Sequence, residues 1–177
     1  MPVRRAAQPP AAPRKPETVS GVRVEDLDLT DAELVGCDLA NVQATGATLT
    51  RVVIRASRLT GTAIHDARLR DVLFEGCRID LASFGGSGLE RVTFEDCVLV
   101  QSDFLQARLM EVRFHRCDVS RGDFREARLT RCELRGCELR DIEGADRLRG
   151  SAMEWSDIVG SAGTWAHALG IDVLDDI

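Results

Sequence analysis

The sequence predicts an all-β solenoid of square cross-section, with about six coils of 20 residues followed by a helical cap. A five-residue period runs without a slip through 24 units, from residue 22 to residue 141. The third residue of every unit is apolar, and glycine, asparagine or aspartate stands fifth in 13 of the 24 units. This period matches neither a helix, at about 3.6 residues, nor a continuous strand, at about 2. It therefore indicates short strands separated by regular corners.

Each unit is expected to turn its first and third side chains inward, as a short strand does. The first residue is small or β-branched in 23 of the 24 units, which suits a position close to the wall. The fifth residue is expected to form the corner, because glycine, asparagine and aspartate tolerate positive φ. Four corners close one coil in 20 residues. Six coils stacked about 4.8 Å apart would form a rod of roughly 29 Å.

The repeat begins VRVED LDLTD AELVG CDLAN at residue 22 and ends at residue 141 with RCELRGCELRD. This pattern resembles the pentapeptide repeat family, whose consensus is commonly written A-(D/N)-L-x-x. The resemblance covers about two thirds of the chain and implies a right-handed quadrilateral parallel β-helix. The chain departs from the family at the second position, where arginine often replaces aspartate or asparagine. These arginines are Arg58, Arg68, Arg78, Arg108, Arg113 and Arg128.

The chain divides into three predicted segments. Residues 1–21 contain all five prolines and four basic residues against one glutamate, which predicts a disordered Pro/Arg-rich tail. Residues 22–146 are assigned to the β-helix. Residues 147–177 leave the repeat and are assigned to a C-terminal cap, with a helix over about 156–169 and then an extended tail. Ser156 is the expected N-cap of that helix.

The cap helix is expected to present an apolar face. A solenoid must cover its open end, so this face is expected to pack on the last coil. The same face could instead join two rods into a homodimer, and the resemblance implies such a role for a C-terminal helix in related proteins. The candidate residues for either contact are Trp155, Ile158, Val159, Trp165 and Leu169.

The six cysteines raise the alternatives of metal ligands, a redox pair or buried small residues. All six occupy the first position of a unit, and five differ in number by multiples of 20, so they form one column on one wall. They are Cys37, Cys77, Cys97, Cys117 and Cys137, with Cys132 on the neighbouring wall. A straight internal column does not supply the tetrahedral array of a metal site, so buried free thiols are expected. Distance alone does not exclude disulfides between coils.

The six phenylalanines all occupy the third position and lie ten residues apart. They should therefore alternate between two opposite walls of the core. The predicted columns are Phe74, Phe94 and Phe114 on one wall, and Phe84, Phe104 and Phe124 on the other.

Composition argues against several functions. The 23 basic and 29 acidic residues give a net charge of −6, which disfavours direct nucleic-acid binding. No apolar stretch reaches the length of a membrane span, and no export signal is evident, so a cytoplasmic protein with reduced thiols is expected. No catalytic motif is present, so the sequence predicts no enzyme activity and no catalytic, cofactor-binding or metal-binding residues.

Function is therefore expected on the outer faces. One wall has a net charge of −6 and is called the acidic wall: Glu25, Asp26, Asp66, Asp103, Asp123, Glu126, Glu143 and Asp146. The main hypothesis is a non-enzymatic, rigid protein-interaction module with an unknown protein partner. The alternative follows from the resemblance: an acidic rod that mimics DNA and modulates DNA gyrase or topoisomerase IV, as in fluoroquinolone resistance. Arginines give the neighbouring wall a net charge of +2, which weakens this alternative.

Overall fold

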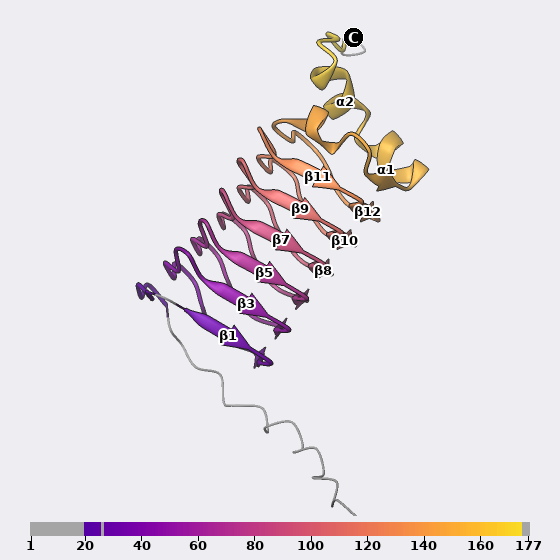
Figure 1. The fold of residues 1–177 in the computed structure, drawn as a ribbon. Helices are drawn as coiled ribbons and strands as arrows, with labels where there is room; N and C mark the ends of the chain where they lie inside the picture. The colour runs from indigo at the N-terminus through magenta and orange to yellow at the C-terminus, as the bar shows by residue number, and fades with distance from the viewer. Residues whose placement is uncertain (1–19, 26, 175–177) are drawn as a thin grey trace, which may run out of the picture.

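The computed structural model describes residues 20–25 and 27–174, which form a rod of stacked coils ending in short helices (Figure 1). The proline-rich segment predicted to be disordered lies outside the described residues, apart from its last two positions. Two walls of the rod are parallel sheets of strands two or three residues long, with six strands in one sheet and seven in the other. The other two walls are joined by isolated bridges, such as Gln43 to Ala63 and Asp38 to Arg58. The predicted square β-solenoid is confirmed.

The first twelve strands alternate between the two sheets along the chain. The six-stranded sheet contains β1 (Asp28–Thr30), β3 (Thr48–Thr50), β5 (Arg68–Arg70), β7 (Gly88–Glu90), β9 (Arg108–Met110) and β11 (Arg128–Thr130). The seven-stranded sheet contains β2 (Glu33–Val35), β4 (Val53–Arg55), β6 (Leu73–Glu75), β8 (Thr93–Glu95), β10 (Arg113–His115), β12 (Glu133–Arg135) and β13 (Ala152–Met153). Strands pair in register one coil apart, so every column of side chains repeats every 20 residues.

The fifth residue of each unit forms the corner, as predicted. Every fifth residue from Asp31 to Asp141 has positive φ. The geometry is the same where the sequence lacks a favourable residue: Leu81 has φ 58° and Arg91 has φ 52°. The corner is held by a hydrogen bond to the next coil, such as Leu81 N–H to the Val100 carbonyl at 2.9 Å. Stacking therefore imposes the left-handed backbone on residues that disfavour it.

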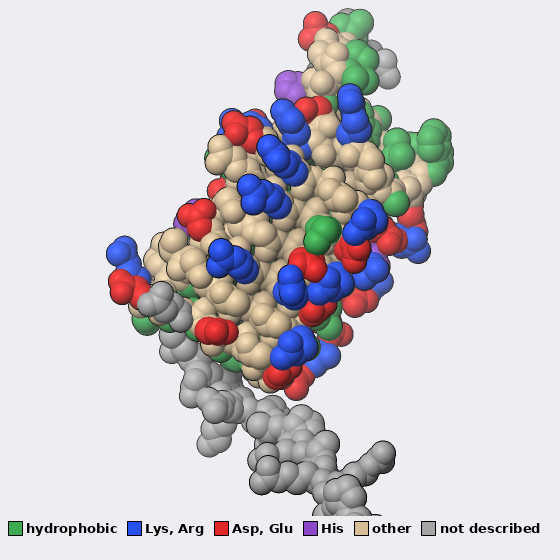
Figure 2. All heavy atoms as spheres, viewed as in Figure 1, with side chains coloured by type: hydrophobic (Ala, Val, Ile, Leu, Met, Phe, Trp, Pro, Cys, Tyr) green, Lys and Arg blue, Asp and Glu red, His purple; other side chains and the backbone are tan. Residues whose placement is uncertain are grey.

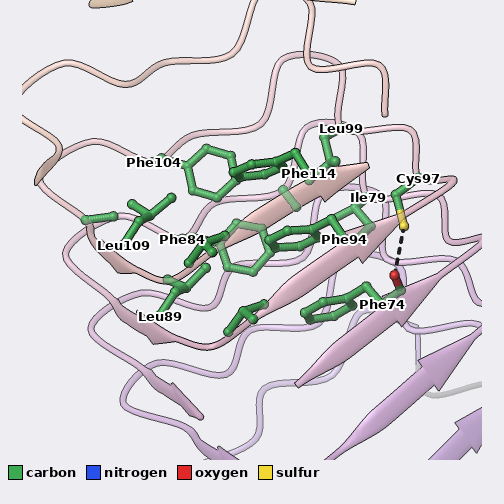
Figure 3. Packing of buried hydrophobic residues seen from close by; sticks show 14 of the residues in the cluster. Phe74, Ile79, Phe84, Leu89, Phe94, Cys97, Leu99, Phe104, Leu109 and Phe114 are labelled. Atoms are coloured by element: carbon green, nitrogen blue, oxygen red, sulfur yellow. Dashed lines mark hydrogen bonds between the residues drawn. The ribbon is translucent and has the colours of Figure 1, made fainter. Parts of the chain in front are cut away.

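The core is filled by the third-position side chains (Figure 3). The phenylalanines form the two predicted columns, with ring centroids 4.9 Å apart between Phe74 and Phe94 and 5.2 Å between Phe84 and Phe104. Rings from opposite columns meet edge to face, at 5.9 Å between Phe84 and Phe94. All six rings are completely buried. Stacked and edge-to-face contacts are both favourable aromatic geometries, so these contacts fix the positions of the rings along the axis of the rod.

First-position hydroxyl and thiol groups satisfy backbone carbonyls of the previous coil. The Ser87 hydroxyl donates to the Ile64 carbonyl at 2.7 Å, and the Ser102 hydroxyl to the Ile79 carbonyl at 2.8 Å. In each case the acceptor lies 23 residues earlier. The first slot thus accepts small polar residues as well as small apolar ones, because the polar group has a partner inside the wall.

The repeat ends at Gly144. This glycine has φ 70°, and a Cβ there would lie 2.6 Å from the Arg125 backbone nitrogen. The chain then enters a 3₁₀ helix, η1 (Ala145–Leu148), whose Ala145 and Leu148 are buried against the last coil. They close the rod end together with β13, which pairs with β12.

The single helix expected over residues 156–169 is instead two short helices, α1 (Trp155–Gly160) and α2 (Ala162–Ala168). The N-cap position of α1 is Glu154 rather than Ser156. The helix is interrupted at the buried Ser161, which has φ −109° and ψ 24°.

Polar side chains attach these helices to the rod. Asp157 accepts the Gly136 N–H at 2.8 Å. Thr164 accepts the Asp141 N–H at 3.1 Å and donates to the Leu139 carbonyl at 2.9 Å. In earlier coils these corner N–H groups donate to carbonyls of the following coil. The cap side chains therefore supply the acceptors that a seventh coil would provide.

Candidate interaction surfaces

The acidic wall is one of the two walls joined by isolated bridges. Asp103 pairs in register with Asp123, and Asp123 with Glu143, so carboxylates follow one another along the rod axis. Asp66 and Glu126 are exposed at the corner that borders this wall. The structure therefore brings Asp103, Asp123, Glu126 and Glu143 together over the later coils, whereas Asp66 lies three coils before Glu126 at the same corner.

The other three predicted residues are separate from this group. Glu25 is exposed on the first coil, and Asp146 is exposed within η1. Asp26 lies outside the described residues.

Arginine interrupts the acidic wall. Arg125 contacts Asp123 at 2.6 Å and Glu143 at 3.8 Å, and Arg147 contacts Asp146 at 3.3 Å. The hydrogen bond from Arg125 lowers the pKa of the Asp123 carboxyl. Asp123 and Glu143, which are neighbours on the acidic wall, thus share one arginine, and its positive charge reduces the negative potential of the wall.

Asp103 has a polar rather than a cationic environment. Its carboxylate accepts the Ser83 hydroxyl at 2.7 Å and the Leu105 N–H at 2.7 Å. The same hydroxyl lies 3.2 Å from His65 Nδ1. These bonds fix the orientation of the carboxylate, and no ion pair within 4 Å joins Asp103 to another described residue.

The corner beside the acidic wall mixes both charges. A hollow of about 600 Å³ is lined by Asp66 and Glu126 from the corner and by Arg108, Arg128 and Arg147. The acidic surface therefore stops at this corner, where the arginines of the six-stranded sheet begin.

A ladder of ion pairs runs along another corner and was not predicted. At residues 31, 51, 71, 91, 111 and 131, acid and arginine alternate from one coil to the next. Arg51 contacts Asp31 at 2.5 Å, and Arg131 contacts Glu111 at 2.6 Å. The hydrogen bond from Arg51 lowers the pKa of Asp31, as that from Arg91 does for Asp71. The sequence does carry a signal for these ion pairs, because acidic and basic residues alternate at positions 20 residues apart.

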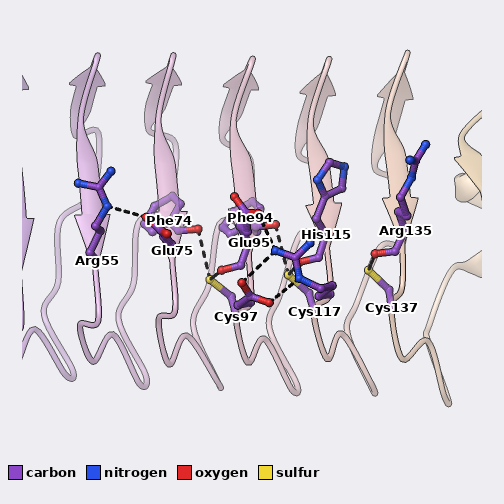
Figure 4. A network of polar contacts seen from close by, with 12 residues as sticks. Arg55, Phe74, Glu75, Phe94, Glu95, Cys97, His115, Cys117, Arg135 and Cys137 are labelled. Atoms are coloured by element: carbon purple, nitrogen blue, oxygen red, sulfur yellow. Dashed lines mark hydrogen bonds and ion pairs between the residues drawn. The ribbon is translucent and has the colours of Figure 1, made fainter.

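All six cysteines are buried free thiols. Figure 4 shows Cys97, Cys117 and Cys137 in one column, and Cys132 lies on the neighbouring wall, as predicted. Cys97 Sγ donates to the Phe74 carbonyl at 3.4 Å, and Cys137 Sγ to the Phe114 carbonyl at 3.2 Å. Burial raises the pKa of Cys132, so its thiol is protonated at neutral pH. Within residues 20–25 and 27–174, no three histidine, cysteine or acidic side chains converge on a common metal position.

The apolar residues predicted for the cap face outward rather than onto the rod. Trp155 and Leu169 are each 76% exposed, and Val159 is also exposed. Trp165 alone packs against the core, and its indole N–H donates to the Ile158 carbonyl at 3.1 Å. An apolar hollow of about 670 Å³ lies between η1, β13 and the two helices. The polar attachment of α1 and α2 to the rod leaves this apolar surface uncovered. None of the described helices has the length and apolarity needed to cross a membrane.

Comparison with known proteins assigns the repeat to a family. A family model described as a pentapeptide repeat region matches residues 27–103 and 82–144, about two thirds of the chain. Rfr23, a pentapeptide repeat protein from the cyanobacterium Cyanothece 51142, has 14% identity and a TM-score of 0.54, covering 77% of this chain and 91% of its own. At this identity the likeness shows the fold alone. No curated protein sequence gives a significant match.

Two further solved structures are more distant. HetL, a pentapeptide repeat protein involved in heterocyst differentiation regulation in Nostoc sp. strain PCC 7120, has 17% identity and a TM-score of 0.43, covering 80% of this chain and 92% of its own. QnrB1, a plasmid-mediated fluoroquinolone resistance protein, has 18% identity and a TM-score of 0.35, covering 84% of this chain and 100% of its own. These TM-scores are too low to support a functional comparison.

Proposed function

Because the chain belongs to the pentapeptide repeat family, we propose that it is a non-enzymatic, rigid protein-interaction module that acts in the cytoplasm. The observation that carries this proposal is the division of the repeat into a filled interior and a charged exterior. Side chains at the first and third positions of each unit form the core. Side chains at the second, fourth and fifth positions present charge on flat, regularly spaced walls. Such a surface suits recognition of another protein by charge complementarity.

The acidic wall is the proposed docking surface for a basic protein partner. The test is affinity capture from the source cells with the full chain as bait, comparing the parent with a triple variant, Asp103→Asn, Asp123→Asn and Glu143→Gln. We expect a specific partner that the triple variant loses. The proposal fails if no protein is retained specifically.

The other bridged wall offers a matched control: Asp38→Asn, Asp118→Asn and Glu138→Gln. Like Asp103 and Asp123, Asp38 and Asp118 each accept the N–H group two residues later. Both variants change the charge equally and remove similar local hydrogen bonds. Equal loss of the partner from both variants would exclude the acidic wall as a specific site.

A second candidate function is DNA mimicry toward DNA gyrase or topoisomerase IV. The in-register carboxylates of Asp103, Asp123 and Glu143 favour it, because they repeat along the axis of a rod. The pairing of Arg125 with two of them disfavours it. The test is a supercoiling assay with purified gyrase, with and without a fluoroquinolone. Neither inhibition nor protection over a micromolar range of the protein would exclude this candidate.

We also propose that the cap joins two copies into a homodimer. The apolar hollow at the rod end is lined by Ile158, Trp165 and Leu169. Trp155 and Val159 are exposed on α1, and a second copy would remove this apolar surface from water. Sedimentation velocity should show a dimer for the parent chain and a monomer for Leu169→Asp. Leu81→Asp is the control, since Leu81 is an exposed leucine on the rod. A monomeric parent chain at high micromolar concentration would contradict the proposal.

A further inference from the structure

The six-stranded sheet carries a column of arginines with one gap. Arg68, Gly88, Arg108 and Arg128 pair in register, so they occupy one line along the rod axis. Strands in a sheet are about 4.8 Å apart, which places Arg108 beside Arg128 and separates Arg68 from Arg108 by about twice that distance. Figure 2 views this wall in the orientation of Figure 1, with basic side chains in a row along it.

Within residues 20–25 and 27–174, none of these arginines has an acidic partner within 4 Å. The ion pairs of this wall within the described residues involve other arginines: Arg51, Arg70, Arg91 and Arg131. Arg68, Arg108 and Arg128 are all exposed. Like charges directly opposite each other in a sheet are destabilising, so Arg108 beside Arg128 is an unfavourable placement in the isolated rod. An anionic ligand would relieve this repulsion.

Gly88 opens a hollow within the column. A cavity of about 510 Å³ runs over β5 to β11, and we call it the arginine groove; it is lined by Arg68, Gly88, Arg108 and Arg128 on one side and by Glu90 and Met110 on the other. A Cβ at Gly88 would meet nothing within 4 Å, so the hollow reflects a missing side chain. Met110 is 39% exposed and provides apolar surface beside it.

We propose that the arginine groove binds an extended acidic segment of a partner protein, with an apolar side chain seated at Gly88. This inference rests on the proposed role as an interaction module and adds a surface distinct from the acidic wall. In an extended peptide, side chains two residues apart point the same way at about 6.6 Å, a spacing that flexible arginine side chains can match. Guanidinium groups bind carboxylates in bidentate geometry, and the apolar side chain would pack against Met110.

Single-stranded nucleic acid fits this groove less well. Proteins that bind single strands commonly stack bases on exposed aromatic side chains. The six phenylalanines are buried, the chain has no tyrosine, and both tryptophans lie in the cap. Asp66 and Glu126 at the adjoining corner would repel further phosphates.

Fluorescence anisotropy with the full chain tests the proposal. The probe is a fluorescein-labelled decapeptide of aspartate and glutamate with one central leucine. Saturable binding should weaken on the order of tenfold in the triple variant Arg68→Gln, Arg108→Gln and Arg128→Gln, since each loses a charge-assisted contact. The matched control is Arg113→Gln, Arg121→Gln and Arg149→Gln, three exposed arginines outside the groove, which should leave binding nearly unchanged. Equal effects of the two triple variants, or no saturable binding to the parent chain, would overturn the proposal.

Gly88→Thr tests the hollow independently of charge. Gly88 lies in strand β7 without positive φ, so threonine should maintain or improve thermal stability while filling the groove. We expect weaker binding of the leucine probe and a smaller effect on a probe with alanine in its place. Unchanged binding of both probes would overturn the seating of an apolar side chain at Gly88.

Two comparisons separate the remaining outcomes. Tighter binding of a labelled ten-nucleotide oligothymidine than of the peptide would overturn the choice of an acidic protein segment. If affinity capture yields a partner that depends on the acidic wall while the decapeptide fails to bind, the arginine groove is wrong and the proposed function stands. If capture yields no specific partner but the decapeptide binds in the groove, the acidic-wall proposal is wrong.

Discussion

At the scale of the residue, position within the five-residue unit decides what a side chain does. A cysteine and a serine at the first position perform the same task, because Cys97 and Ser87 both donate to the carbonyl 23 residues earlier. A residue at the fifth position adopts positive φ whatever its identity. The local preference of a single residue is therefore overridden by hydrogen bonds between coils.

Leu81→Asn should stabilise the rod. Leu81 has φ 58° and is exposed, whereas asparagine tolerates the left-handed region. We expect a gain of about 1 kcal/mol in the free energy of unfolding, measured by urea denaturation. Leu105→Asn is the control, because Leu105 lies outside the corners, and it should give no gain. A loss of stability at Leu81 would contradict the strain assigned to this corner.

At the scale of the element, no single coil is stable alone, because each three-residue strand depends on its neighbours in register. The core columns and the cap illustrate this in different ways. Phe104 is sandwiched between Phe84 and Phe124, one coil away on either side. Thr164 replaces a missing coil by bonding two backbone groups of the last one.

Phe104→Ala should destabilise the protein by about 3 to 5 kcal/mol, because it leaves a cavity and removes two stacked and two edge-to-face contacts. Phe104→Leu should cost about 1 to 1.5 kcal/mol, since leucine fills the same slot in other coils. Urea denaturation monitored by circular dichroism measures both values. Equal costs for the two variants would show that the aromatic column does not set the core packing.

Thr164→Val should lower the free energy of unfolding by about 1 to 3 kcal/mol, because it keeps the side-chain shape but leaves Asp141 N–H and the Leu139 carbonyl without their partner. Hydrogen exchange should rise first at Asp141. Thr130→Val, at an exposed position of β11, is the control and should have little effect. Unchanged exchange at Asp141 would contradict the role given to Thr164.

At the scale of the whole molecule, charge is arranged in columns along the walls and corners of the rod. Opposite charges alternate along one corner, carboxylates gather on one wall, and uncompensated arginines gather on the next. The faces of the rod therefore differ in charge.

Stability should fall as the pH drops below the ordinary aspartate pKa of about 3.9. Hydrogen bonds from Arg51, Arg91 and Arg116 lower the pKa of Asp31, Asp71 and Asp96 respectively in the folded state. A depressed folded pKa gives stability that is complete above the unfolded pKa and lost as the pH falls through the folded one. The triple variant Arg51→Gln, Arg91→Gln and Arg116→Gln should show a smaller decrease in Tm between neutral and acidic pH. An identical decrease would contradict this assignment.

The sequence by itself determined the repeat architecture. Its register places the core, the corners and the columns of cysteine and phenylalanine, because a period of five with inward first and third positions admits one arrangement of side chains. It also placed Asp103, Asp123 and Glu143 in one column of the acidic wall. Each of these features follows from position in the repeat, which can be read without coordinates.

Only the tertiary structure decided the features that depend on contacts between columns or beyond the repeat. The five-residue period could not predict that the cap helix is divided at Ser161 or that Trp155 and Leu169 face outward. These features depend on the polar contacts with the last coil that orient the two helices. Likewise, the ion pair between Asp123 and Arg125 depends on how far side chains reach across neighbouring columns, as does the lack of an ion pair for Arg108 among the described residues. Sequence spacing fixes which residues share a column, whereas side-chain geometry fixes which charges remain available to a partner.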